Sequence, residues 1–136
     1  MIMADELIKL GQWSEIAKLN DGSGIVMPFV QEIFLLQCKV AGTGYYIDED
    51  AGKLISLEDT VTLVREADNK YDEMAIRIDT KYGVKLGYVP RRKNEILARL
   101  LDGGKILYGK VVELRTPTRH DNWWIDITVK IYMKDL

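Results

Sequence analysis

Residue types that build disulfides, metal centres and catalytic sites are scarce in this chain of 136 residues. The single cysteine, Cys38, excludes an intrachain disulfide, and its apolar surroundings favour a buried, unreactive thiol. One histidine, His120, and one cysteine cannot make a zinc site of the usual composition. No nucleophile with an evident partner base accompanies them. We therefore expect no catalytic residue, no metal and no cofactor, and hence no enzyme.

Long apolar runs are also missing, and none approaches the roughly 18 residues that a membrane-spanning helix needs. The first ten residues, MIMADELIKL, carry acids where a secretory signal has its basic region. These absences predict a cytoplasmic protein without a membrane partner. The balance of 47% apolar and 29% charged residues is typical of one folded domain rather than a disordered chain.

The net charge is only −2, so composition by itself does not indicate a nucleic-acid partner. The charges are nevertheless uneven along the chain. Residues 85–110 hold seven Lys or Arg against two acids, whereas residues 48–59 hold five acids against one lysine. A polarised surface of this kind can orient a charged partner, although solvated surface charge explains the same spacing.

Residues 1–31 predict a helical extension followed by an arm. Apolar residues recur at helical spacing between residues 4 and 20, and Asp21-Gly22-Ser23-Gly24 breaks the pattern. This glycine stretch lacks the Gly-Lys-Ser/Thr ending of a phosphate loop and is interpreted as a linker. Residues 25–30 contain Pro28 and are expected to form an arm that packs on the main domain.

Residues 32–136 form the main predicted domain, which is mainly β. Apolar and β-branched residues predict strands near residues 33–41, 60–67, 75–79, 84–89 and 106–115, the first of them mostly buried. The last strand, from Trp123 to Met133, alternates most clearly, with Ile125, Ile127 and Val129 on one side.

Pro90 ends the third central strand and begins the one predicted helix. Its apolar face comprises Ile96, Leu97, Leu100 and Leu101, and Gly103 ends it. Consecutive antiparallel strands with a single short helix predict a small, partly closed OB-like barrel, preceded by the N-terminal helical extension.

Aromatic and charged residues gather at the strand ends of this scaffold, where binding groups are usually displayed. The pair Tyr45-Tyr46 follows Gly42-Thr43-Gly44, and strand alternation would turn one ring into the core and the other into solvent. The helix begins with Arg91-Arg92-Lys93, although its dipole disfavours cations there by about 0.3–1 kcal/mol each. That cost suggests an anion facing these cations; solvated surface charge is the alternative.

Three segments carry a resemblance to a known family: VAGTGYY (residues 40–46), VTLVREADNKYDEMAIRI (residues 61–78) and KLGYVPRR (residues 85–92). Together they resemble the HIRAN domain, which occurs in some SNF2-type remodelling helicases and also alone in bacterial proteins. The likeness spans roughly Cys38 to Met133. It implies a modified OB-like barrel that binds single-stranded DNA, with preference for a free 3′ end in the helicase-linked members.

The resemblance also implies residue roles. Tyr45 and Tyr46 match a tyrosine pair that contacts the terminal nucleotides, and Arg91 matches a basic residue that contacts phosphate. Tyr71 and Asp72 match a Tyr-Asp pair whose carboxylate accepts a hydrogen bond from the terminal 3′-hydroxyl. The candidate nucleic-acid-binding residues are Tyr45, Tyr46, Tyr71, Asp72, Tyr88, Arg91, Arg92 and Lys93.

Two positions depart from the helicase-linked pattern. Gly44 stands where those members have an arginine, so one of their phosphate contacts is missing. Tyr88 replaces a histidine. The candidate residues also have structural explanations, because tyrosines of a small barrel commonly pack in its core and Asp72 can bond backbone amides after a turn.

The expected function is a non-catalytic module for single-stranded DNA or DNA 3′ ends, linked to DNA repair or replication. An alternative is a protein-interaction or assembly module, including a homo-oligomer, that uses the N-terminal arm or the edge at Trp123-Trp124. A small-molecule pocket in the barrel is a third possibility.

Overall fold

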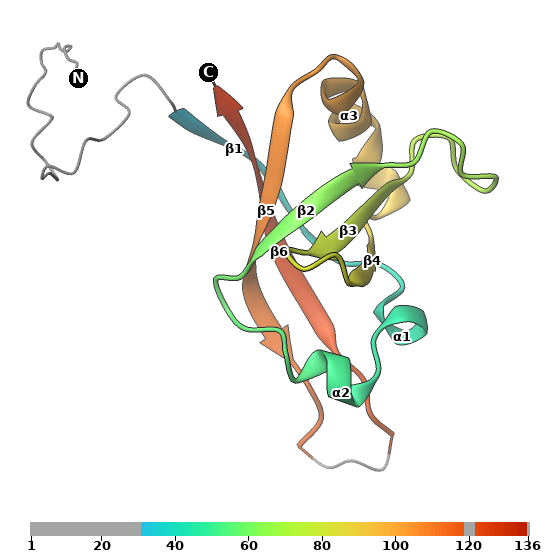
Figure 1. The fold of residues 1–136 in the computed structure, drawn as a ribbon, viewed down its shortest axis with the longest axis vertical. Helices are drawn as coiled ribbons and strands as arrows, with labels where there is room; N and C mark the ends of the chain where they lie inside the picture. The colour runs from blue at the N-terminus through green and yellow to red at the C-terminus, as the bar shows by residue number, and fades with distance from the viewer. Residues whose placement is uncertain (1–30, 119–121, 136) are drawn as a thin grey trace, which may run out of the picture. The chain divides into compact units, whose positions relative to one another are not determined.

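The computed structural model describes residues 31–118 and 122–135, and its compact body comprises residues Phe34–Met133. The elements in chain order are β1 (Gln31–Lys39), α1 (Thr43–Tyr46), α2 (Glu49–Gly52), β2 (Thr60–Arg65), β3 (Ile76–Thr80), β4 (Lys85–Tyr88), α3 (Arg91–Asp102), β5 (Ile106–Arg115) and β6 (Asp126–Asp135) (Figure 1). The predicted N-terminal helices, linker and arm lie outside the described residues, as does His120. Within the described ranges no helix is both long and apolar enough to cross a bilayer.

The six strands form one sheet in the order β1-β6-β5-β2-β3-β4, so β1 and β4 are its two edges. Just beyond the end of β1, Ala41 pairs with Tyr88 of β4 through two backbone hydrogen bonds of 2.8 and 2.9 Å. This short bridge joins the two edges without closing the sheet along its length. The fold is therefore mainly β and a partly closed, OB-like barrel, as the sequence predicts.

The core is built largely from the predicted alternation of the last strand. Ile125, Ile127, Val129 and Ile131 are all buried, and strands β2, β3 and β5 contribute further aliphatic side chains to the same cluster. Cys38 is buried there as expected, and burial raises the pKa of its thiol to about 11, which the nearby charge of Lys93 offsets only in part. The thiol is thus protonated and unreactive at neutral pH.

The first strand differs from its prediction. β1 begins at Gln31 rather than residue 33, and most of its side chains are exposed or half-buried, so the expectation of a mostly buried strand is wrong. The physical reason is its place at the sheet edge, where only Cys38 within the strand is fully buried and Leu35 and Leu36 pack against the core while partly exposed. An apolar run does not by itself distinguish a central strand from an edge strand.

The helices also differ in part from the prediction of a single helix. α3 follows Pro90 as expected, but two four-residue helices, α1 and α2, precede β2. In α3 the buried side chains are those of Asn94, Leu97 and Ala98, whereas Ile96 is 60% exposed. Leu97, Leu100 and Leu101 therefore face the core as predicted, whereas Ile96 does not, and Asn94 is buried on that face in its place.

Candidate nucleic-acid interface

The loop between β2 and β3 presents the first part of the site. The Asn69 side-chain oxygen accepts hydrogen bonds from the backbone amides of Tyr71 (2.9 Å) and Asp72 (3.1 Å), which is an Asx turn. The base of the loop is closed by a bond from the Glu66 amide to the Ala75 carbonyl (2.9 Å). This turn holds the backbone in place while the Tyr71 ring is 79% exposed. A ring displayed on a braced turn is a surface on which a planar group can stack.

Asp72 is held at the foot of the same loop by three groups. Its carboxylate accepts hydrogen bonds from the Met74 amide (2.9 Å) and the Asn94 side chain (2.8 Å), and Arg91 Nε lies 3.6 Å from Oδ2. Burial on its own raises the pKa of Asp72, but these hydrogen bonds and the charges of Arg91 and Arg65 outweigh it and hold the pKa below its ordinary value. Asp72 is thus an oriented carboxylate with lone pairs to spare.

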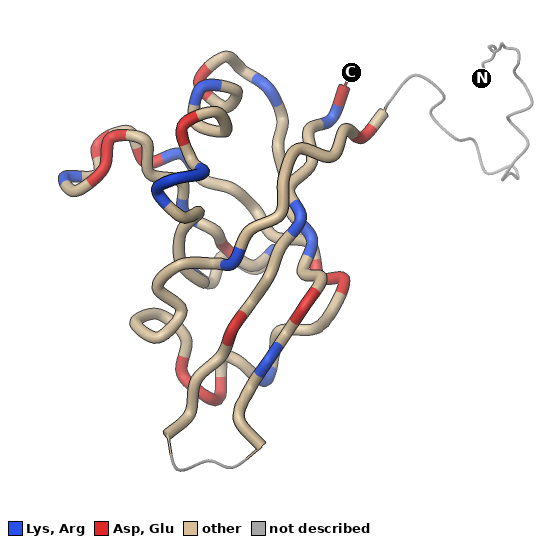
Figure 2. The backbone as a smooth tube through the Cα atoms, turned by 180° about the vertical axis from the view of Figure 1, so that it is seen from behind, with Lys and Arg blue, Asp and Glu red and all other residues tan. Residues whose placement is uncertain are grey.

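Arg91 links the loop to the start of α3. Besides facing Asp72, its guanidinium donates a hydrogen bond to the Tyr71 carbonyl. Figure 2 shows the basic start of α3 beside the loop between β2 and β3, which carries acidic positions. The two segments are about 20 residues apart in sequence but form one wall of a groove.

The Tyr45-Tyr46 pair does not lie in a strand. Both residues belong to α1, and both rings are exposed, Tyr45 by 90% and Tyr46 by 41%. The prediction that one ring enters the core is therefore wrong, because the chain turns at Gly42 and period-2 alternation ends with β1. The helical turn directs Tyr46 toward Tyr88 of β4, with the ring centroids 6.0 Å apart in an edge-to-face contact.

These parts converge on one groove of about 450 Å³. Five of the eight candidate residues line it: Tyr46, Tyr71, Asp72, Tyr88 and Arg91. The other lining residues are Ala41, Asn69, Ala75, Lys85 and Val89.

The remaining three candidates lie elsewhere. Tyr45 lines a neighbouring hollow with Gly44, although its ring is 6.3 Å from that of Tyr46. Arg92 and Lys93 line a different surface hollow, beside Leu36 and Ile96. Lys93 also donates a hydrogen bond to the Gln37 carbonyl (3.0 Å), which gives it a structural role. A helical period of 3.6 residues explains the separation, since three consecutive side chains on α3 cannot all face one groove.

Two residues of the groove region, Lys85 and Asn94, escape sequence reasoning. Lys85 sits in the groove with its Nζ 4.0 Å from the Tyr46 ring centroid and 4.7 Å from that of Tyr88. Asn94 is buried and orients Asp72. The signal for Asn94 is its polarity at a helical position within reach of the helix start. Lys85 gives no such signal, because an irregularity in β4 decides which face of the strand it occupies.

Behind the groove, Glu66 anchors a polar network. It accepts hydrogen bonds from the Tyr88 hydroxyl (2.8 Å) and Asn69 (3.1 Å), and it pairs with Arg77 at 3.0 Å. Burial alone raises the pKa of Glu66, but the bonds from Asn69, Tyr88 and Arg77 together lower it below the ordinary value. The network therefore holds the Tyr88 ring and the Asx turn against the same charged carboxylate.

This network predicts an acid-sensitive fold. Because the pKa of Glu66 is lower in the folded state, its stabilising contribution is complete above the unfolded pKa of about 4.3 and disappears as the pH falls through the folded value. We expect the free energy of unfolding, measured by urea denaturation between pH 6 and pH 3, to fall less steeply for Glu66→Gln than for the wild type. Glu73→Gln, an exposed change in the same loop, is the control. Equal slopes for the wild type and Glu66→Gln would contradict the network.

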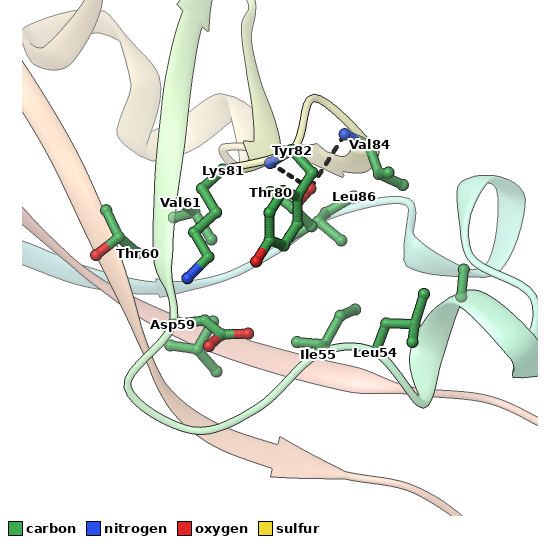
Figure 3. A pocket seen from close by; sticks show the side chains of 12 residues that line it. Leu54, Ile55, Asp59, Thr60, Val61, Thr80, Lys81, Tyr82, Val84 and Leu86 are labelled. Carbon is green, nitrogen blue, oxygen red and sulfur yellow. Dashed lines mark hydrogen bonds between the residues drawn. The ribbon is translucent and has the colours of Figure 1, made fainter.

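A second, apolar pocket lies at another place on the barrel, between the α2–β2 connection and the turn that joins β3 to β4. Leu54, Ile55, Leu86 and Tyr82 are among its lining residues, and Thr80 Oγ1 accepts the Tyr82 and Val84 amides beside it (Figure 3). Its volume is about 80 Å³, far below the roughly 300–1,000 Å³ of small-molecule sites. The pocket does not favour the small-molecule hypothesis.

The last strand is predicted to offer an edge for protein interaction, but β6 lies between β1 and β5, so this part of the prediction is wrong. Trp124 is exposed, whereas Trp123 packs against the core. Tyr132 is half-buried and stacks on Tyr108 with ring centroids 5.5 Å apart, so its ring already packs within the protein. The protein-interaction alternative stays a prediction, as do a homo-oligomer and the role of residues 1–31.

Fold and groove together define a small OB-like barrel with an aromatic and cationic groove beside its closing bridge. The chain belongs to the HIRAN domain family, whose family model matches residues 33–134. None of the curated protein sequences matches the chain.

Solved structures agree with this assignment. The crystal structure of a protein from Lactobacillus plantarum is 29% identical, with 79% of this chain and 99% of that chain covered and a TM-score of 0.67. The crystal structure of the HIRAN domain of human HLTF is 21% identical, with 76% of this chain and 78% of that chain covered and a TM-score of 0.57. An NMR structure of the HLTF HIRAN domain in its DNA-bound conformation is 22% identical, covers 75% of this chain and 79% of that chain, and has a TM-score of 0.50. The two HLTF structures show a shared fold.

Proposed function

We propose that this protein binds single-stranded DNA, and DNA 3′ ends in particular, in the groove between the β2–β3 loop, α1 and the start of α3. The observation that carries the proposal is the convergence of three tyrosine rings, an oriented carboxylate and two cations on one groove. Membership of the HIRAN family supports it, since the HLTF domain of that family has a DNA-bound conformation. Binding of strand ends suits a role in DNA repair or replication.

Aromatic stacking supplies affinity without sequence preference. A base stacked on an aromatic ring contributes about 1–3 kcal/mol and does so for any base. Tyr71 is the most exposed ring of the groove and stands on a braced turn, so little conformational entropy is lost when a base packs on it. The proposal requires no catalysis, because stacking and hydrogen bonding alone account for the arrangement.

Asp72 supplies the preference for a hydroxyl end. Its carboxylate can accept one more hydrogen bond, from a terminal 3′-hydroxyl, and a bond of that charged kind contributes roughly 1.5–3 kcal/mol. A terminal phosphate would instead bring two like charges together in the groove.

The test compares labelled oligonucleotides that end in 3′-hydroxyl or 3′-phosphate by fluorescence anisotropy. We expect the wild type to prefer the hydroxyl end by about 10-fold, which corresponds to the lower part of that free-energy range. Asp72→Asn, nearly isosteric and uncharged, is expected to abolish the preference. Glu73→Gln, which removes one exposed charge from the same loop, is expected to retain it. Equal binding of both ends by the wild type, or an unchanged preference in Asp72→Asn, refutes the assignment of Asp72.

A further inference from the structure

Lys85 is the cation of the groove that the candidate residues leave out. It lies on β4, and its ammonium group contacts the rings of Tyr46 and Tyr88 at 4.0 and 4.7 Å. Among the ion pairs formed by described residues, none involves Lys85, whereas Arg91 is turned toward Asp72 and the Tyr71 carbonyl. The charge of Arg91 is thus partly neutralised within the protein, and that of Lys85 is not.

An irregularity in β4 places Lys85 in the groove. In a regular strand, residues three apart point to opposite faces, so Lys85 and Tyr88 would lie on different sides of the sheet. Here Gly87 pairs with Ile78 while Lys85 pairs with Asp79, and Leu86 is the extra residue of a bulge. The bulge sends Leu86 into the core and brings Lys85 to the same face as Tyr88.

The two rings hold this cation in place. Lysine side chains normally lose considerable rotamer freedom when they bind, and the contacts with Tyr46 and Tyr88 restrict Lys85 beforehand. The hydroxyl groups of the same two tyrosines also raise the pKa of Lys85, Tyr88 contributing most, so the group stays fully charged at neutral pH. A pre-positioned cation of this kind can bind an anion at a small entropic cost.

The contact also changes what Tyr46 offers a ligand. The ammonium group occupies a ring face at stacking distance, so a base cannot stack on that face at the same time. Tyr71, whose exposed ring carries no such cation among the described contacts, is free to stack. The groove is therefore divided into a base-binding side at Tyr71 and a cationic side at Tyr46, Lys85 and Tyr88.

We propose that Lys85, clamped between Tyr46 and Tyr88, binds a backbone phosphate of the single strand whose base stacks on Tyr71. This inference rests on the proposed function and adds the residue that neutralises the strand. It also gives the chain a phosphate contact within the groove although position 44 is glycine.

The salt dependence of binding tests the proposal. Each phosphate neutralised on a single strand contributes about −0.7 to the slope of log K against log salt concentration. We expect Lys85→Met, which keeps an apolar stem of similar length, to make the slope for a labelled oligothymidine shallower by about 0.7. The affinity loss should be about 5- to 10-fold at low salt and should shrink as salt rises. Lys85→Arg should keep the wild-type slope.

Lys81→Met is the matched control, because Lys81 is exposed on the adjoining turn and lies over Tyr82, outside the groove. It removes the same charge and is expected to leave the slope unchanged. A Lys85→Met protein that loses affinity by the same factor at every salt concentration would mean that Lys85 only braces the rings, and the proposal would be wrong. Wild-type protein that fails to bind the oligonucleotide would overturn the proposed function itself, and the assignment of Lys85 with it.

Discussion

Replacing Tyr71 by alanine is expected to lower affinity for single-stranded DNA by about 5- to 100-fold while leaving the thermal unfolding temperature nearly unchanged. The ring is 79% exposed and makes no part of the core, so its removal creates no cavity. Its backbone, which carries the hydrogen bonds to Asn69 and Arg91, is unaffected by the substitution. The loss should appear at every salt concentration, since stacking neutralises no phosphate.

Tyr82→Ala provides a closely matched control. Tyr82 is also on a tight turn and is 82% exposed, but it lines the small apolar pocket rather than the groove. We expect it to bind oligonucleotides within about 2-fold of the wild type, a difference of roughly 0.4 kcal/mol. Similar losses in both variants would mean that exposed tyrosines bind DNA non-specifically, and the groove would lose its special role.

Gly87→Ala is expected to have the largest effect on stability. A β-carbon at this position would lie 2.2 Å from the Ala41 carbonyl oxygen and 2.8 Å from a Val40 methyl group. The backbone φ of +155° is also one that side-chain-bearing residues rarely adopt. Both effects act on the bridge between Ala41 and Tyr88 that joins the sheet edges. We expect a loss of about 3 kcal/mol in the free energy of unfolding, or about 10 °C in Tm.

The appropriate comparison is Gly83→Ala in the turn between β3 and β4. Gly83 also has a left-handed φ, +87°, but its added β-carbon would meet nothing within 4 Å. It should therefore cost only the conformational term of about 1–2 kcal/mol. Calorimetry gives the free energy of unfolding of each variant, and the difference between Gly87→Ala and Gly83→Ala measures the steric conflict apart from the backbone strain. If Gly87→Ala proves no less stable than Gly83→Ala, the bridge does not hold the barrel together as described.

Most of the fold follows from local sequence patterns. The alternation of Ile125, Ile127 and Val129 predicts the central last strand, and Pro90 marks the boundary between β4 and α3. These signals are reliable because each depends only on the residues of one short segment and on the backbone conformation that those residues favour. The edge position of β1 was not predictable, because it depends on which strands become neighbours, and that is decided by the whole sheet.

The candidate site was predictable only in part, for similar reasons. Tyr71 and Asp72 follow an Asn that forms an Asx turn, so local chemistry places them on a loop. The position of Lys85 in the groove depends on a bulge in β4, opposite Ile78 and Asp79. A bulge moves side chains from one face of a strand to the other, and the hydrophobic pattern of the sequence does not reveal where it occurs. Arg92 and Lys93 are predicted from their charge in the first turn of the helix, but the helix turns them away from the groove.

The central claim is that single-stranded DNA binds in the groove beside the closing bridge. An NMR titration of the ¹⁵N-labelled protein with a short oligothymidine ending in a 3′-hydroxyl tests this claim most directly. We expect the largest amide shifts at Tyr46, Tyr71, Asp72, Lys85 and Arg91, with little change around Leu54 and Tyr82 at the apolar pocket. Shifts that gather at the apolar pocket or at the outer side of α3, or no shifts at saturating oligonucleotide, would contradict it.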